Sequence, residues 1–123
     1  MISVIVNREG NLIRAIYAGG HSGYDDPGRD IICSGVSTLL FTAANALEDI
    51  CGYDSESFFR ISGEGTEDVN LRITVPDLGD DETKNRAQII MRTVELGLIG
   101  IARDYNDSKN KYVEIINSRT PEV

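Results

Sequence analysis

The feature that most constrains the fold is a helical pattern of apolar residues that begins at Ile31 and ends near Gly52. Apolar side chains recur there at intervals of three and four positions, which places them on one face of a helix. They are Ile32, Val36, Leu39, Leu40, Ala43, Leu47 and Ile50. A glycine shortly after the last apolar residue commonly ends a helix. The pattern therefore predicts a helix with a wide apolar face that must be buried against another layer.

A second helical pattern starts near Asp81 and continues to Ile101, and five other segments carry the signals of strands. These segments are "ISVIVN" (2–7), "LIRAIYA" (12–18), "SFFRIS" (57–62), "VNLRITV" (69–75) and "KYVEII" (111–116). The first two form a hairpin through "REGN", where Gly10 and Asn11 can take positive φ, and "GEGTED" is the turn between the next two. The order is ββαββαβ. Because paired strands are interrupted by two helices, we expect an α+β fold, with two helices packed on a largely antiparallel sheet.

The size and charge of the chain limit the classes of function that it can have. Its 123 residues, 41% of them apolar, are enough for a single domain with one buried core. Acidic residues outnumber basic ones by 20 to 12, and a net charge of −8 argues against direct binding to nucleic acid or to an anionic membrane. No apolar run approaches the roughly 18 residues of a membrane span, and no export signal is present, so we expect a cytoplasmic protein.

The only histidine and one of the two cysteines lie at the two ends of a glycine-rich stretch, "HSGYDDPGRDIIC". His21 follows a predicted strand, and Cys33 lies in the first turn of the predicted helix. Free backbone N–H groups in that turn favour a thiolate, and they could also stabilise an oxyanion when the sulfur attacks a carbonyl. The glycines permit a flap over bound substrate. The pair is a candidate for nucleophilic catalysis, against the simpler interpretation that both residues are structural.

Two neighbours of the pair keep two interpretations each. Asp30 is either the N-cap of the helix, which we prefer, or a third member that stabilises His21. Ser37 lies one turn after Cys33 and either bonds toward the site or bonds a helix carbonyl. Cys51 is predicted to be a core or helix-end thiol, because about 27 Å of helix separates it from Cys33. A single histidine and no paired-cysteine motif give no expected metal site or cofactor.

The stretch "GGHSGY" followed by "GRDIICSGVSTLLF" resembles the signature of the ribosomal-processing cysteine protease family. In that family a Gly-His pair after an N-terminal hairpin precedes a helix start of the Asp-Ile-Val-Cys type. The similarity in size and element order covers essentially the whole chain, and its specific part runs from Gly20 to Ser37. The chain departs from the family pattern at Ser22, where alanine is usual, at Ile32, where valine is common, and at "CSG".

The resemblance implies a single cysteine-protease domain over residues 1–123 that works as a homodimer. Its substrate would be the N-terminal extension of a basic large-subunit ribosomal protein, removed during ribosome assembly. Cys33 matches the nucleophile, His21 the base, Asp30 the acidic position before the cysteine, and Ser37 the serine one turn later. The expected substrate loop contains Gly20, Ser22, Gly23, Tyr24 and Gly28.

Two functions of other classes remain open at this point. A non-enzymatic ribosome-assembly module would also explain the small size and the acidic surface. It would be favoured if His21 faced the core instead of the thiol. A thiol redox or acyl-transfer protein would also use an activated Cys33, but "CSGV" lacks the second cysteine of a Cys-x-x-Cys pair.

Overall fold

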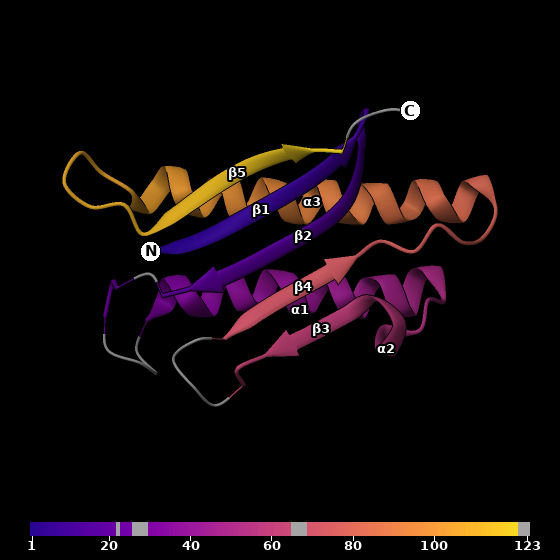
Figure 1. Cartoon of the computed structure of the whole chain (residues 1–123), viewed down its shortest axis with the longest axis horizontal. Coiled ribbons are helices and arrows are strands. Elements are labelled where there is room, and N and C mark those ends of the chain that lie inside the picture. The colour runs from indigo at the N-terminus through magenta and orange to yellow at the C-terminus, as the bar shows by residue number, and fades with distance from the viewer. Residues whose placement is uncertain (22, 26–29, 65–68, 121–123) are drawn as a thin grey trace.

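A five-stranded sheet carries both long helices on the same face (Figure 1). The computed structural model describes residues 1–21, 23–25, 30–64 and 69–120. The strands are β1 (Ile2–Glu9), β2 (Leu12–Gly20), β3 (Phe59–Ser62), β4 (Asn70–Thr74) and β5 (Val113–Arg119), in the spatial order β3-β4-β2-β1-β5. The helices are α1 (Ile31–Cys51), α2 (Ser55–Phe58) and α3 (Asp81–Tyr105). The predicted α+β class is therefore confirmed.

The sheet is mixed, so the prediction of a largely antiparallel sheet is wrong. The hairpin of β1 and β2 is antiparallel, but β5 pairs with β1 in parallel, with Ile2 opposite Val113. The reason is the crossover helix α3, whose 25 residues span about 37 Å and carry the chain back along the sheet. As a result β5 begins beside the start of β1, where the Ile2 N–H donates to the Tyr112 carbonyl at 2.8 Å.

The structure differs in detail from the local predictions for the strand at 57–62 and for the first hairpin turn. The expected strand at 57–62 begins only at Phe59, because the one-turn helix α2 precedes it and adds a third helix to the predicted order. In the first hairpin turn Gly10 has a φ of 59°, whereas Asn11 does not take positive φ. The turn expected at 63–68 falls partly outside the described residues.

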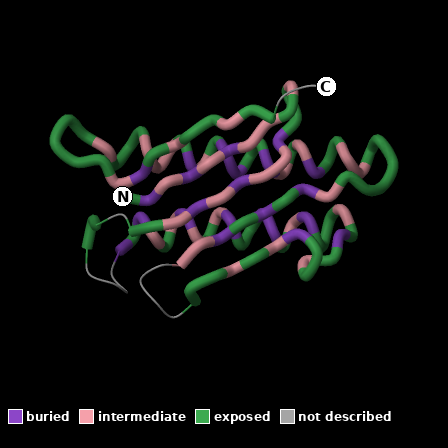
Figure 2. The backbone as a smooth tube through the Cα atoms, in the orientation of Figure 1, coloured by how far each residue is buried: buried purple, intermediate pink, exposed green. Residues whose placement is uncertain are grey.

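The core lies between the helices and the inner face of the sheet, where Figure 2 shows the buried positions. The predicted apolar face of α1 is buried except at two positions: Leu39 is partly buried, and Ile50 is 53% exposed. From α3, Ala87, Met91, Val94 and Leu98 are buried. The periodicity of both helices therefore predicted most of the residues that hold them to the sheet.

By length and hydropathy, α1 could cross a membrane, contrary to the expectation that no segment would reach this threshold. This is weak evidence for a span, because the core helix of a soluble protein passes the same test. Six residues of α1 are buried within the fold. The apolar character of the helix is therefore explained in part by its packing on the sheet.

Candidate active site

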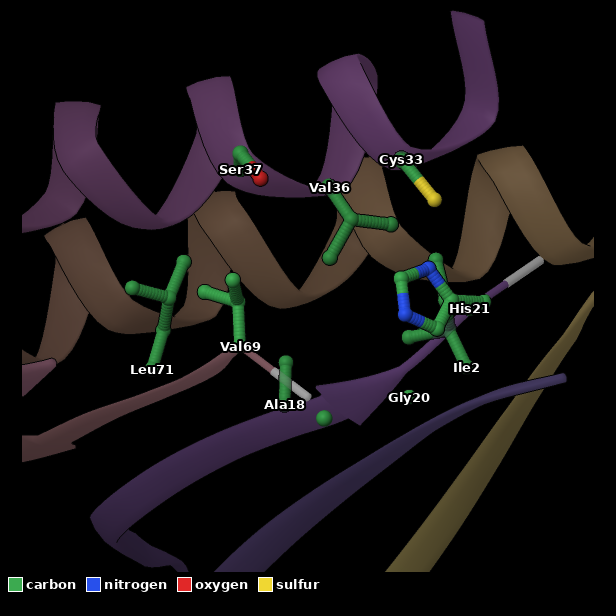
Figure 3. A pocket seen from close by; sticks show the side chains of 10 residues that line it. Ile2, Ala18, Gly20, His21, Cys33, Val36, Ser37, Val69 and Leu71 are labelled. Carbon is green, nitrogen blue, oxygen red and sulfur yellow. The ribbon is translucent and has the colours of Figure 1, made fainter. Parts of the chain in front are cut away.

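A cavity of about 180 Å³ lies between α1, the end of β2 and the segment that leads into β4, and His21 and Cys33 both line it (Figure 3). The Cys33 thiol points toward the His21 imidazole. No hydrogen bond joins these two described side chains. The described part of the chain also contains no group of three or more His, Cys, Asp or Glu side chains that could hold a metal ion. The other lining residues are Ile2, Ala18, Gly19, Gly20, Val36, Ser37, Val69 and Leu71. The structure therefore brings together a histidine and a cysteine twelve positions apart, in a mostly apolar recess.

The end of β2 positions His21. Gly20 directly before it has a φ of +96° and pairs with Ile2 at the start of β1. A Cβ at this position would lie 2.5 Å from the carbonyl oxygen of Met1, so a residue with a side chain would force the strands apart. The glycine thus permits the sharp exit of the chain that leaves His21 at the mouth of the cavity.

Asp30 positions Cys33 by capping α1. Its Oδ1 accepts hydrogen bonds from the backbone N–H groups of Ile32 and Cys33, both at 3.0 Å. Its carbonyl accepts the N–H of Ser34 at 3.1 Å. The geometry is that of the preferred N-cap interpretation. It also corrects a mechanistic expectation, because these three first-turn N–H groups are engaged by Asp30 and are not free to bind an oxyanion.

Ser37 and Cys51 lie at different distances along α1 from the cavity. Ser37 lines the cavity with Cys33, but within the described ranges its hydroxyl makes neither of the two hydrogen bonds considered from the sequence. Cys51 is the last residue of the helix, and its thiol lies 3.8 Å from the Thr83 carbonyl. Burial raises the pKa of the Cys51 thiol, and the charge of Arg86 only partly offsets this. Cys51 is therefore a helix-end thiol remote from the cavity.

Three of the five residues expected in the substrate loop are described, and of these Gly20 lines the cavity. Gly23 is exposed, whereas Ser22 and Gly28 lie outside the described residues. The Tyr24 ring packs edge-on against Tyr105 and Tyr112, with centroids 5.9 and 5.3 Å away. At Tyr24 the loop is thus held against the end of α3 and the segment before β5.

Several residues that line the cavity were not predicted from the sequence. Val69 directly precedes β4, Leu71 lies near the start of β4, and Ile2 begins β1. Their alternating pattern showed that they face inward. It could not show that this part of the sheet lies beneath the first turns of α1, because strand order is set by pairings between distant segments.

A family model that matches most of the chain identifies its sequence family. A family model described as "Cysteine protease Prp" matches residues 1–110 of the 123. The chain belongs to the Prp family of cysteine proteases. Prp membership makes the chain a cysteine protease. It sets aside the non-enzymatic module, as does the exposed position of His21 beside the thiol.

Two curated relatives carry the name ribosomal processing cysteine protease Prp. The protein from Bacillus subtilis is 27% identical over 97 residues, which cover 79% of this chain and 82% of the relative. The protein from Staphylococcus aureus is 28% identical over 107 residues, which cover 87% of this chain and 92% of the relative. The match to both relatives therefore extends over most of each chain.

Solved structures support the same fold. SMU.848 from Streptococcus mutans has a TM-score of 0.74 at 20% identity, covering 98% of this chain and 96% of that protein. Prp from S. aureus with a covalently linked product peptide has a TM-score of 0.69 at 24% identity, covering 96% of this chain and all (100%) of that one. A further S. aureus Prp structure contains a substrate peptide and has a TM-score of 0.67 at 21% identity, covering 96% and 100%. At these identities the structures establish the Prp fold for this chain.

Proposed function

We propose that the chain is a ribosomal-processing cysteine endopeptidase that removes the N-terminal extension of a large-subunit ribosomal protein during ribosome assembly. The observation that carries the proposal is the shared cavity of His21 and Cys33, with the thiol pointing toward the imidazole. The names of the two curated relatives support the ribosomal substrate. The specific roles of the two residues follow from their chemistry.

In the proposed reaction, His21 takes the thiol proton of Cys33, and the sulfur adds to the scissile carbonyl carbon. His21 then gives that proton to the amine that departs as the peptide bond breaks. The shortened protein leaves, and the extension stays bound to Cys33 as a thioester. His21 then takes a proton from water, which attacks the thioester and releases the extension. Asp30 serves as a positioning residue that holds the first turn of α1, and Ser37 forms part of the cavity wall.

The proposed binding partner, a basic ribosomal protein, is supported by the charge of the chain and by the family resemblance. A chain with a net charge of −8 attracts a basic ribosomal protein and repels nucleic acid and anionic membranes. Residues 1–123 would then act as a single cysteine-protease domain, in the cytoplasm and as a homodimer. The loop with Gly20, Ser22, Gly23, Tyr24 and Gly28 would contact the extension.

The test is cleavage of the extended ribosomal protein, followed by mass spectrometry. The wild-type chain should give one shortened product. Cys33→Ala should bind the extension without cutting it, and His21→Asn should cut at least about a hundredfold more slowly, as expected for loss of a general base. Cys51→Ser is the matched control and should keep full activity. Full cleavage by Cys33→Ala would overturn the assigned nucleophile, and an intact substrate with the wild type would overturn the proposed function.

A further inference from the structure

A second hollow begins at Cys33 and follows one face of α1 away from the catalytic cavity. Its volume is about 550 Å³, and the described residues that line it all belong to α1, on successive turns from Cys33 through Ser37 and Phe41 to Asn45. Cys33 and Ser37 also line the catalytic cavity, and Figure 3 shows them one turn apart on the helix. The two hollows therefore meet at the thiol that would carry out the chemistry.

The chemistry of this face differs from that of the rest of the surface. Charged residues make up 26% of the chain, yet α1 has none before Glu48. The polar groups on the face are the hydroxyls of four residues and the Asn45 amide, and within the described part of the chain they make no hydrogen bond. By contrast, the Thr93 hydroxyl in α3 bonds the Ile89 carbonyl at 2.7 Å. The face is uncharged, and its polar groups are available to a ligand.

Phe41 gives this face an aromatic platform. Its side chain is 41% exposed, and its ring packs on Phe59 of β3 with centroids 5.4 Å apart. Phe41 follows Cys33 by eight residues, which corresponds to about 12 Å along the helix. An extended peptide covers that distance with about three or four residues. A peptide held at Cys33 can therefore reach Phe41 with a nearby side chain.

We infer that this face of α1 is a substrate subsite for an uncharged stretch of peptide beside the scissile bond. Phe41 packs against an apolar or aromatic side chain of the substrate, three or four residues from that bond, while the hydroxyls and Asn45 bond the peptide backbone. The inference rests on the proposed function and adds the side chains that select the sequence. The basic body of the ribosomal protein lies beyond this subsite.

The test compares Phe41→Ala with two other variants on peptides that span six residues on each side of the cleavage point. Phe41→Leu keeps an apolar contact, and Ile50→Ala removes an exposed apolar side chain from the same helix but outside the hollow. We expect Phe41→Ala to lower kcat/KM about tenfold, through KM with little change in kcat, because the contact is kept from bound substrate to transition state. Phe41→Leu should recover most of the loss, and Ile50→Ala should behave as wild type.

Single alanine replacements along the peptide then locate the contact. Alanine at one apolar peptide position, three or four residues from the scissile bond, should lower the kcat/KM of the wild-type enzyme as much as Phe41→Ala does. The same peptide should show no further loss of kcat/KM with the Phe41→Ala enzyme. Equal kcat/KM for Phe41→Ala and wild type, or losses that simply add at every peptide position, would overturn the subsite while leaving the protease intact. A wild-type chain that cuts none of the peptides or the full protein would instead overturn the proposed function, and the subsite with it.

Discussion

Cys33 and Cys51 lie at opposite ends of α1 and have different surroundings. Cys33 lines the cavity in the first turn, near the positive end of the helix dipole. Cys51 lies at the negative end, and its burial disfavours the thiolate. The same side chain therefore has different chemistry at the two positions.

The first prediction is selective alkylation. With iodoacetamide near neutral pH, Cys33 should react much faster than Cys51, because only thiolate reacts and the pKa of Cys51 is raised above its ordinary value of 9.0. Reaction at Cys51 should increase only as the pH rises beyond that value. Peptide mass spectrometry over time measures both sites in one sample. Equal rates, or faster reaction at Cys51, would contradict an activated Cys33.

At the scale of the element, the start of α1 depends on Asp30. This residue is 6% exposed, and its carboxylate holds the N–H groups of Ile32 and Cys33. A capping side chain fixes where a helix begins, and here the nucleophile candidate lies three residues later. The cap therefore sets the position of Cys33 relative to the end of β2.

Substitutions at Asp30 separate capping from catalysis. Asp30→Ala should lose roughly 0.5–2 kcal/mol of unfolding free energy, whereas Asp30→Asn and Asp30→Ser should keep most of it, because both side chains cap helices well. If capping is the main role, Asp30→Asn should also keep most of the cleavage rate. Thermal melts and cleavage assays measure the two properties. A stable but nearly inactive Asp30→Asn would place the carboxylate charge in the catalytic set.

At the scale of the whole molecule, a buried carboxylate connects the layers. Glu95 of α3 is 2% exposed and accepts hydrogen bonds from Arg8 of β1 and from Arg92, the latter at 2.5 Å. Arg8 also donates to the Asn117 side chain of β5 at 2.8 Å. Burial by itself would raise the pKa of Glu95, but the hydrogen bonds and charges of the two arginines outweigh it and lower the pKa.

This connection predicts a loss of stability in acid. Because the folded pKa lies below the ordinary 4.5, the stabilisation is complete above that pH and is lost as the pH falls through the folded value. At neutral pH, Glu95→Gln should lose roughly 1.5–3 kcal/mol of unfolding free energy, since it leaves the largely buried guanidinium of Arg8 without its carboxylate. Urea denaturation at several pH values should show this difference shrinking in acid. The exposed Glu82→Gln is the control, and a constant difference across pH would contradict the role of the Glu95 charge.

The sequence by itself determined the α+β class, both long helices, and the loop that joins the end of β2 to the start of α1. Each of these depends on local periodicity and caps. It predicted Asp30 as the cap of α1 and Cys51 as a thiol at its far end. Only the tertiary structure decided the parallel pairing of β5 with β1 and the inner wall from β4, because both depend on contacts between segments far apart in the chain. It also decided that the Asp30 carboxylate occupies the N–H groups of Ile32 and Cys33, because a carboxylate that caps a helix uses donors that an oxyanion would also need.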